Sequence, residues 1–420
     1  MENIKLKYGK ETLSIDIPKE NLFGVIKAKF PKIKDNESEI FEMKKSLKNP
    51  IGTSKLSLIA KKGKKVAIMV SDITRPSPSK KILPLLLEEL YKSGIKDRDI
   101  TIIFGMGIHR SHTKEEQIKL VGKDIFNRIK CVDSNKEKYV YLGKTSRNTP
   151  IYLNKSLIEA DIRICTGNIE YHYFAGYSGG AKAVMPGASN NKSIENNHKL
   201  QLSENSKSGK IINNPVREDI DEVGEILGID FLFNVVLNEK KEVLKAFSGD
   251  YIKAHREGCK YLDSLYNIKI DEKADIVIVS PGGYPKDLNL YQTQKALDNA
   301  SHAVRMGGTI ILVSECSEGF GESTFKDWIE SSTYSKELIE RLKEEFVLGG
   351  HKAAAIARVL EKADIYFVSD MKKEDVEKIY FTPKESIQRA LKDAMNKFEN
   401  KSKVLIIPQG SSVLPVVKKK

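Results

Sequence analysis

Cysteine and long apolar runs are scarce in this chain of 420 residues, and each scarcity excludes a class of protein. The four cysteines, Cys131, Cys165, Cys259 and Cys316, are far apart and form no CxxC pair, so neither a disulfide scaffold nor a thiolate metal site is indicated. No apolar run approaches the roughly 20 residues of a membrane-spanning helix. The charged, alternating start of the chain is unlike a secretion signal. We therefore expect a reduced, cytoplasmic protein without a membrane partner.

The net charge of +13 raises the question of nucleic acid as a partner. The lysines are scattered, however, and many stand beside acids, as at Lys114 and Lys343, each of which is followed by two glutamates. The chain has no basic stripe interleaved with aromatic residues and no known nucleic-acid-binding module. We expect no nucleic-acid partner, because a lysine-rich composition or an anionic substrate explains the charge as well.

The pattern of apolar residues along the chain is typical of an α/β protein. An alternating stretch over 3–17, with a turn at Gly9, predicts a β-hairpin. Short apolar runs then alternate with segments of helical spacing, which indicates βαβ units and buried parallel strands. The predicted strands are 65–71, 99–106, 160–165, 274–280, 309–314, 365–368 and 404–407, and the predicted helices are 80–91, 288–305, several in the 330s to 350s, and 384–398.

A chain of this length exceeds one ordinary core, so two domains are predicted. The α/β pattern stops and restarts across 268–273. We predict an N-terminal α/β domain over 1–270, with 408–420 as a segment that could return to it, and a C-terminal α/β domain over 273–405. The expected fold is thus α/β, with mostly parallel sheets in two domains and an active-site cleft between them.

The segment 167–198 carries the densest group of reactive side chains. It follows a predicted strand and places His172, Lys182 and His198 around a turn rich in glycine. Glycine lets a backbone approach a bound group closely, and histidine offers proton transfer or metal ligation near neutral pH. A lysine can carry a covalent link to a carbonyl-derived group. The alternative is a glycine-rich connection with surface polar residues, but three reactive groups on one loop favour a site.

The same segment resembles a known family. Its pattern H-x-F-A-G-Y-S-G-G-x-K, followed by M-P-G-A-S and N-N-H, is similar to that of the nickel-dependent lactate racemases. The resemblance implies a cofactor, nickel held by a pyridinium-3,5-bisthiocarboxylic acid mononucleotide (the nickel-pincer nucleotide), covalently linked at Lys182. It also implies that His198 is a nickel ligand, that His172 is a catalytic acid/base, and that separate cofactor biosynthesis proteins load the enzyme. The domain over 1–270 then becomes the cofactor-binding domain.

A second group of candidate residues follows the predicted strand 65–71. Ser77 before Pro78 is a good helix N-cap, so a helix is expected to start there. Asp72, Thr74 and Arg75 then lie at the carboxyl end of a strand, where open α/β sheets bind ligands, and Arg75 suits a phosphate or carboxylate. A capped turn with an incidental ion pair is the alternative.

The resemblance extends over this segment through its D-x-T-R-P pattern. It implies that Asp72, Ile73, Thr74 and Arg75 contact the cofactor and that Arg75 also contacts the substrate.

A third group follows the predicted strand 99–106. Thr113 and Glu116 are spaced as a capping box, which places His109 between a strand and a helix at the same sheet edge as Arg75. An isolated histidine is more often a surface or satisfied core residue. The family pattern G-x-H-R is present and implies that His109 is the second catalytic acid/base, whereas His112 has no such match.

A fourth group of candidate residues lies in the second domain, again between a predicted strand and a predicted helix. The strand is 274–280, and we expect Asp287 to cap the helix. Gln292 and Lys295 are three residues apart and share one helical face, which by itself is typical of a solvated surface. The family pattern Y-Q-x-x-K implies that Tyr291, Gln292 and Lys295 bind the substrate.

One feature departs from the family. The lactate racemases carry a tryptophan in the second domain, whereas the only tryptophan here, Trp328, does not match that position. The chain has His351 and Lys352 there instead, which would either add polarity for a larger or more acidic hydroxy acid or cap a helix.

Together these patterns predict an isomerase that inverts the carbinol carbon of a 2-hydroxy acid, lactate or a related acid. Hydride would leave for the tethered cofactor and return from it, with His109 and His172 as the two acid/bases. A non-catalytic protein that binds a nucleotide-like anion is one alternative. An NAD-dependent dehydrogenase is another, although no clean GxGxxG with a following acidic residue is present.

Overall fold

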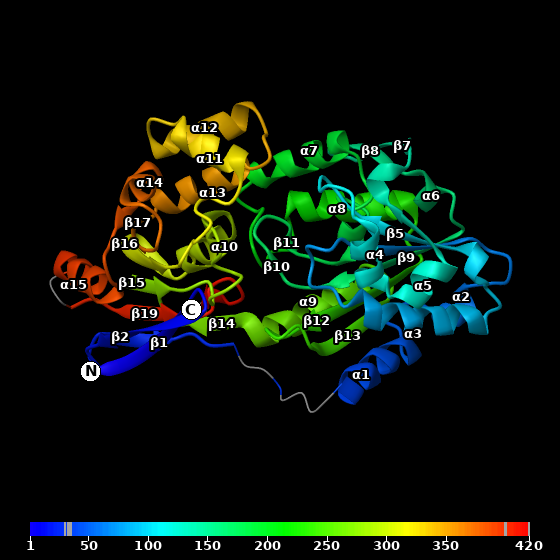
Figure 1. The fold of residues 1–420 in the computed structure, drawn as a ribbon, viewed down its shortest axis with the longest axis horizontal. Helices are drawn as coiled ribbons and strands as arrows, with labels where there is room; N and C mark the ends of the chain where they lie inside the picture. Colours follow the sequence, from blue (N-terminus) through cyan, green and yellow to red (C-terminus); the bar gives the residue numbers. More distant parts are fainter. Residues whose placement is uncertain (29–30, 32–35, 399–400, 419–420) are drawn as a thin grey trace. The chain divides into compact units, whose positions relative to one another are not determined.

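The chain forms two units, and the second is inserted into the first. The computed structural model describes residues 1–28, 31, 36–398 and 401–418. Met1–Lys29 and Leu265–Lys420 make up one unit, which we call the terminal unit, and Phe30–Ser264 make up the other, the inserted unit (Figure 1). Each unit is built around a six-stranded, mostly parallel sheet. The predicted α/β class is therefore confirmed.

The sheet of the inserted unit has apolar residues on both faces. In β4 (Val66–Ser71), Val66, Ile68 and Val70 face one core cluster, whereas Ala67 and Met69 face another. A strand buried on both faces needs a near-continuous apolar run, which explains why the run 65–71 predicted this strand from the sequence. The strands, in spatial order, are β13 (Val243–Gly249), β12 (Phe231–Leu237), β9 (Ile162–Asn168), β4, β5 (Ile100–Gly105) and β6 (Lys130–Asp133), with β13 antiparallel.

Helices cover both faces of this sheet, as in a doubly wound fold. The cluster with Val66 is covered by α1 (Asn36–Lys48), α2 (Leu56–Ile59), α3 (Ser79–Lys92), α4 (Lys114–Val121) and α5 (Lys123–Arg128). The cluster with Met69 is covered by α6 (Lys155–Ile158), α7 (Asn191–Lys199), α8 (Pro215–Leu227) and α9 (Lys253–Tyr266). Two hairpins lie outside the main sheet, β7 (Tyr139–Lys144) with β8 (Pro150–Asn154), and β10 (Tyr171–His172) with β11 (Gly176–Tyr177).

The terminal unit has a parallel sheet with the spatial order β18-β17-β16-β15-β19-β3. These strands are β18 (Thr382–Pro383), β17 (Ala363–Val368), β16 (Val304–Val313), β15 (Ala274–Val279), β19 (Val404–Ile407) and β3 (Leu22–Val25). The helices are α10 (Leu290–Ser301), α11 (Ser323–Glu330), α12 (Ser335–Glu344), α13 (Gly350–Leu360), α14 (Lys373–Lys378) and α15 (Ile387–Lys397). None of the helices in the described parts of the chain has the length and apolar character to cross a membrane.

The predicted division at 270–273 needs a correction at both ends of the chain. The hairpin of β1 (Glu2–Tyr8) and β2 (Glu11–Ile17) packs on the core of the terminal unit, and β3 pairs with β19 in its sheet. The predicted return of 408–420 also differs, because β20 (Leu414–Val417) pairs with β14 (Asn267–Ile270) inside the terminal unit. The last two residues of that segment lie outside the described ones. Long-range pairing, rather than order along the chain, decides which unit these segments join.

Two predicted helix caps are wrong and one is confirmed. Helix α3 begins at Ser79, with Pro78 at its N-cap, and the Ser77 hydroxyl accepts no hydrogen bond from the backbone of the helix. Helix α10 is capped by Asn289, whose side chain accepts from the backbone of Gln292, and Asp287 instead accepts from the backbone N–H of Gly9 at 2.6 Å. The capping box of Thr113 and Glu116 is present. Asp287 is used by the tertiary contact with Gly9, whereas the Ser77 hydroxyl is buried with no hydrogen-bond partner among the described residues.

The N-terminal hairpin should therefore contribute to the stability of the terminal unit. Leu6 is fully buried in the cluster that includes Ile276 and Ile311, so Leu6→Ala removes packing and leaves a cavity. We expect a loss of about 3 kcal/mol in the free energy of unfolding, measured by urea denaturation. Leu13→Ala, on the same hairpin but only partly buried, is the matched control and should cost clearly less. Equal effects of the two changes would contradict the packing described here.

Candidate active site

The candidate residues of the inserted unit meet where the strand order reverses. From β4 the chain continues to β5 and β6 on one side, and then returns to β9 on the other side. Because these strands are parallel, their carboxyl ends lie at one sheet edge, and ligands of open α/β sheets bind at such a reversal. The loop after β4 carries Asp72 to Arg75, the loop after β5 carries His109, and the segment after β9 carries His172 and Lys182. The loops also touch directly, since the backbone N–H of Gly107 donates to the carbonyl of Gly187 at 3.0 Å.

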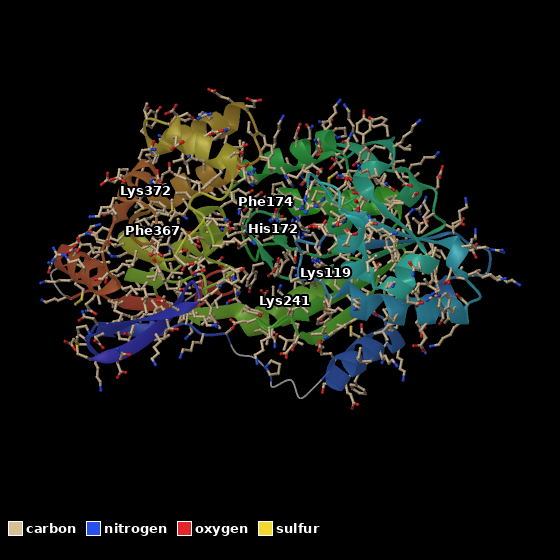
Figure 2. All side chains as sticks on the ribbon, in the orientation of Figure 1. Lys119, His172, Phe174, Lys241, Phe367 and Lys372 are labelled. Atoms are coloured by element: carbon tan, nitrogen blue, oxygen red, sulfur yellow. The ribbon has the colours of Figure 1, made fainter. Side chains whose placement is uncertain are left out.

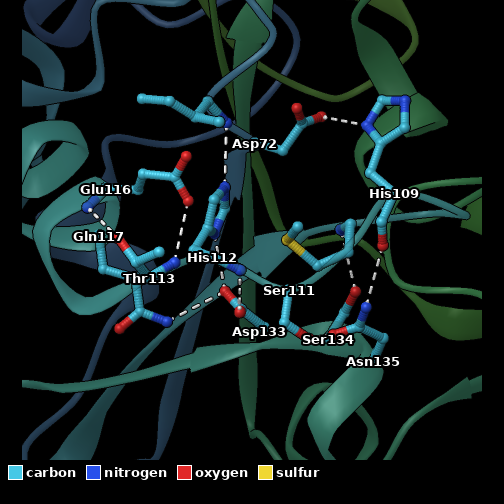
Figure 3. A network of polar contacts seen from close by, with 12 residues as sticks. Asp72, His109, Ser111, His112, Thr113, Glu116, Gln117, Asp133, Ser134 and Asn135 are labelled. Atoms are coloured by element: carbon cyan, nitrogen blue, oxygen red, sulfur yellow. Dashed lines mark hydrogen bonds and ion pairs between the residues drawn. The ribbon is translucent and has the colours of Figure 1, made fainter.

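Asp72 and His109 form a pair across two of these loops (Figure 3). The Asp72 carboxylate Oδ2 lies 3.4 Å from Nδ1 of His109, and Arg75 Nε lies 3.6 Å from the same oxygen. Burial of Asp72 disfavours its charge, but hydrogen bonding from His109 and Thr74 and the charge of Arg75 outweigh burial and lower its pKa to about 2. An ionised Asp72 carboxylate 3.4 Å from Nδ1 favours the His109 tautomer with its proton on Nδ1, which leaves Nε2 as the nitrogen that can exchange a proton with a ligand.

The end of β6 supports the His109 loop, and the sequence interpretation did not single it out. The Ser134 hydroxyl accepts from the backbone of Met106 at 3.0 Å and donates to the carbonyl of Gly187 at 2.9 Å. Asn135 donates to the carbonyl of His109 at 3.1 Å. His109 and Asn135 also line a cavity of about 460 Å³ with Tyr139 and the start of α7. The only sequence signal was a run of polar residues directly after a strand, a pattern shared by many ordinary turns.

The segment after β9 gathers its three reactive side chains around one aromatic ring. Phe174 lies with its ring centroid 4.5 Å from that of His172 and 5.0 Å from that of His198. The Lys182 amine is 5.9 Å from the same ring and 3.5 Å from Nε2 of His172. Figure 2 shows His172, the last residue of β10, next to Phe174, which lies between β10 and β11. The structure thus brings together the three residues that the sequence singled out in this segment.

The lowered pKa of Lys182 is consistent with the tautomer of the neighbouring His172 ring. Burial of the Lys182 amine, and then the charges of Arg217 and Arg75, keep its pKa well below the usual range, which favours the neutral amine. Nδ1 of His172 accepts from the backbone N–H of Ala175 at 3.3 Å, so the neutral ring carries its proton on Nε2, toward Lys182. An uncharged amine beside a ring N–H can act as a nucleophile.

Arg217 holds the backbone between His172 and Lys182 in place. Its fully buried guanidinium donates to the carbonyls of Ala175, Tyr177 and Gly179, and it lies 3.7 Å from the Asp221 carboxylate. His255 of α9 is also fully buried, and its Nε2 is 2.8 Å from the carbonyl of Ser178. This turn is therefore fixed by side chains from two helices beneath it. Asp221, one of several acidic residues on α8, is part of this support.

His198 reaches the group from the last turn of α7. Asn197, its neighbour, is buried and donates to Asp219 of α8 at 2.8 Å, which anchors this turn. His198 is 8% exposed, against Phe174. Within the described ranges of the chain, no group of three or more His, Cys, Asp or Glu side chains is arranged to hold a metal ion.

The remaining candidates lie on α10 of the terminal unit. This helix follows β15, whose neighbours β16 and β19 lie on opposite sides, so it also begins at a reversal of strand order. Gln292 and Lys295 are exposed on it, and Tyr291 is partly buried. Lys352, at the start of α13, lies with its amine 3.7 Å from the ring centroid of Tyr291 and donates to the Tyr291 carbonyl at 2.6 Å. His351 is buried, and burial, with the charge of Lys352, lowers its pKa to about 3, so it is neutral.

Comparison with known proteins gives a consistent result along the chain. Residues 8–209 match the lactate racemase N-terminal domain, and residues 270–415 match the lactate racemase C-terminal domain. The lactate racemase of Thermoanaerobacterium thermosaccharolyticum is 34% identical over 424 residues, which cover 99% of both chains. That of Lactiplantibacillus plantarum is 33% identical and covers 99% of this chain and 100% of its own. The structure of the T. thermosaccharolyticum lactate racemase apoprotein matches with a TM-score of 0.90 at 32% identity, over 100% of each chain.

The fold and these relatives define an α/β isomerase rather than a binding protein or a dehydrogenase. The chain belongs to the lactate racemase family, so its reaction is a racemisation. Membership also implies a cofactor.

The lowered pKa of Asp72 predicts a specific loss of stability in acid. The stability that a carboxylate gains from a lowered pKa is present above its ordinary value of 3.8 and is lost as the pH falls through about 2. Asp72→Asn should therefore lower the free energy of unfolding by up to about 2 kcal/mol near pH 6, with a difference that shrinks below about pH 4. Urea denaturation over this pH range measures it. Asp124→Asn, whose side chain is 79% exposed, is the control and should show no such convergence; a pH-independent effect of Asp72→Asn would contradict the assignment.

Proposed function

We propose that this protein inverts the carbinol carbon of a 2-hydroxy acid, lactate or a related acid, with a nickel-pincer nucleotide attached at Lys182. One observation carries the proposal: the buried amine of Lys182 lies 3.5 Å from Nε2 of His172, and both lie against the aromatic ring that also contacts His198. A tether, a proton carrier and a metal donor are thus available around one point at the sheet edge.

The residues present fit the proposed cofactor. A covalent link to a lysine requires its neutral amine, which the surroundings of Lys182 favour. A nucleotide that brings its own donors to nickel asks for a single protein ligand, and the imidazole of His198 is a suitable one. Asp72, Ile73, Thr74 and Arg75 follow β4 at the strand reversal and are proposed to hold the nucleotide. Cofactor biosynthesis proteins would be the partners that supply it.

Inversion at a carbinol carbon requires that carbon to become planar, as in a 2-oxo acid, because either face can then be attacked. When bound, the cofactor supplies the acceptor and donor of hydride. The chain supplies two proton carriers: Nε2 of His109, oriented by Asp72 at Nδ1, and Nε2 of His172, oriented by the Ala175 N–H at Nδ1. The ring that takes the hydroxyl proton must start neutral with a lone pair on Nε2, and the ring that returns a proton must start as the imidazolium. His109 and His172 exchange these two states between the two directions, and His172 gives up the Ala175 contact whenever its Nδ1 carries a proton.

Binding of the substrate is assigned to cations and to one amide. Arg75 is 49% exposed at its side chain and can pair with the substrate carboxylate. Lys295 adds a second cation, Gln292 can orient the substrate hydroxyl, and Tyr291 supplies an aromatic contact. Gln292 and Lys295 are exposed on α10, as substrate-binding side chains must be before the substrate arrives.

The tether can be tested without any assay of activity. Protein produced together with the cofactor biosynthesis proteins should have a larger intact mass than protein produced alone, and the added mass should vanish in Lys182→Ala. Lys192→Ala, which changes an exposed lysine of the neighbouring α7, is the control and should keep the adduct. An unchanged mass of the native chain under full supply of cofactor would refute the link.

The proposed mechanism with two histidines predicts that racemisation depends equally on the rings of His109 and His172. His109→Ala and His172→Ala should each lower kcat for racemisation in both directions by about 100- to 10,000-fold, the usual contribution of a general acid/base. Polarimetry or chiral chromatography of a panel of 2-hydroxy acids measures this and identifies the substrate. His302→Ala, at the end of α10, is the control. Full racemisation by either active-site variant would eliminate the scheme.

A further inference from the structure

His112 is buried beside the proposed site and has no part in the reaction described above. Its side chain is 1% exposed and packs edge-on against Phe104, with ring centroids 5.1 Å apart. It lies three residues after His109 in the loop that follows β5. Figure 3 shows its ring between Asp133 at the end of β6 and the backbone of the loop after β4.

The contacts of His112 fix its tautomer at both nitrogens. Nδ1 is 2.8 Å from Oδ1 of Asp133, and the backbone N–H of His112 donates to Oδ2 of the same carboxylate at 2.8 Å. The backbone N–H of Ile73 donates to Nε2 at 3.0 Å. Because an N–H cannot accept, Nε2 must carry the lone pair, and the proton stays on Nδ1 facing the carboxylate.

This arrangement connects three strand ends through one side chain. Asp133 belongs to β6, His112 to the loop after β5, and Ile73 to the loop after β4. Ile73 directly follows Asp72, whose Oδ1 accepts from the backbone of Thr74 at 2.8 Å and whose Oδ2 faces His109. A displacement of the Ile73 backbone would therefore displace the carboxylate that orients His109.

We propose that His112 and Asp133 form a positioning pair that holds the Ile73 backbone, and thereby sets the Asp72 carboxylate against the His109 ring. His112 itself exchanges no proton with substrate. A carboxylate that fixes a histidine tautomer, which in turn fixes a functional group, is a common form of support for reacting side chains. The catalytic consequence rests on the proposed role of His109, but the geometry itself can be tested in protein that lacks cofactor.

The geometric test uses protein whose seven histidines carry ¹⁵N. In the native chain, the ring nitrogens of His112 should show the Nδ1–H tautomer with a hydrogen-bonded Nε2, and those of His109 should show the Nδ1–H tautomer. His112→Asn keeps a donor toward Asp133 but is too short to reach Ile73, so the His109 signals should move toward those of a tautomer mixture. His112→Gln can place an amide oxygen near the Ile73 N–H and should restore most of the native pattern. Unchanged His109 signals in His112→Asn would overturn the proposal.

The kinetic test uses the loaded enzyme and separates positioning from simple destabilisation. His112→Asn and Asp133→Asn should lower kcat by about 10- to 100-fold, as expected for a small misplacement of a reacting group, with KM nearly unchanged. His112→Gln should recover most of the loss although it removes the same packing against Phe104. Gln117→Ala, which removes another donor to Asp133 and leaves the Ile73 contact, is the control and should stay near the native kcat. A fall of kcat only in proportion to the unfolded fraction would overturn the proposal.

The two tests separate this proposal from the proposed function. If the native loaded enzyme inverts no hydroxy acid, the proposed function fails, while the ¹⁵N pattern of the cofactor-free variants still decides the positioning role. If His109→Ala abolishes racemisation but His112→Asn leaves kcat unchanged, the positioning role fails and the proposed function stands.

Discussion

The reversal of strand order between β4 and β9 is the constraint on which the candidate site depends. Parallel strands end at one edge, and at the reversal the connecting helices leave to opposite faces, so the loops after β4, β5 and β9 are left facing one another. Asp72, His109 and Lys182, which are far apart in sequence, are gathered by this topology alone. The direct contact between Gly107 and Gly187 then fixes how closely the loops approach. A residue larger than glycine at 187 would place a Cβ 2.2 Å from the carbonyl of Ala183, so this approach requires glycine.

Buried charges also influence the pKa values of the reactive side chains on these loops. Arg217 is fully buried, and its guanidinium is satisfied by backbone carbonyls and by Asp221, as a buried cation must be. The same positive charge is one cause of the lowered pKa of Lys182, while Arg75 contributes to the lowered pKa of Asp72. Burial and two arginines thus lower the pKa of a lysine, while hydrogen bonds and one arginine lower the pKa of an aspartate in the same group of loops. The two shifts favour a neutral base and a charged acid. Such perturbed pKa values are typical of functional sites, whose reactive groups need defined protonation states.

Local patterns in the sequence predicted the strands, the hairpin and the residues of the site, because each is marked by apolar spacing or by a compact motif such as the one around Lys182. Partners that depend on distant pairing were not predicted. Nothing near Leu22 shows that β3 joins β19, and nothing near Asp133 shows that its carboxylate meets His112. The cap expected at Asp287 failed for the same reason, since the sequence does not reveal that the backbone N–H of Gly9 donates to the Asp287 carboxylate. Family membership explains why the motif residues were singled out as a group, whereas the residues that support them belong to no motif and were not.

The insertion of one unit into the other has a consequence for biosynthesis. Phe30–Ser264 contain all strands of their own sheet, so this unit can fold as soon as it leaves the ribosome, in the way that domains generally do. The terminal unit must wait, because β3 pairs with β19 and the hairpin packs on a core that is synthesised much later. During that interval the apolar faces of β1 and β2 have no core to cover, and the closure of such a long loop is entropically costly. The hairpin of β1 and β2 is therefore a segment exposed to chaperones or to aggregation until the terminal unit is complete.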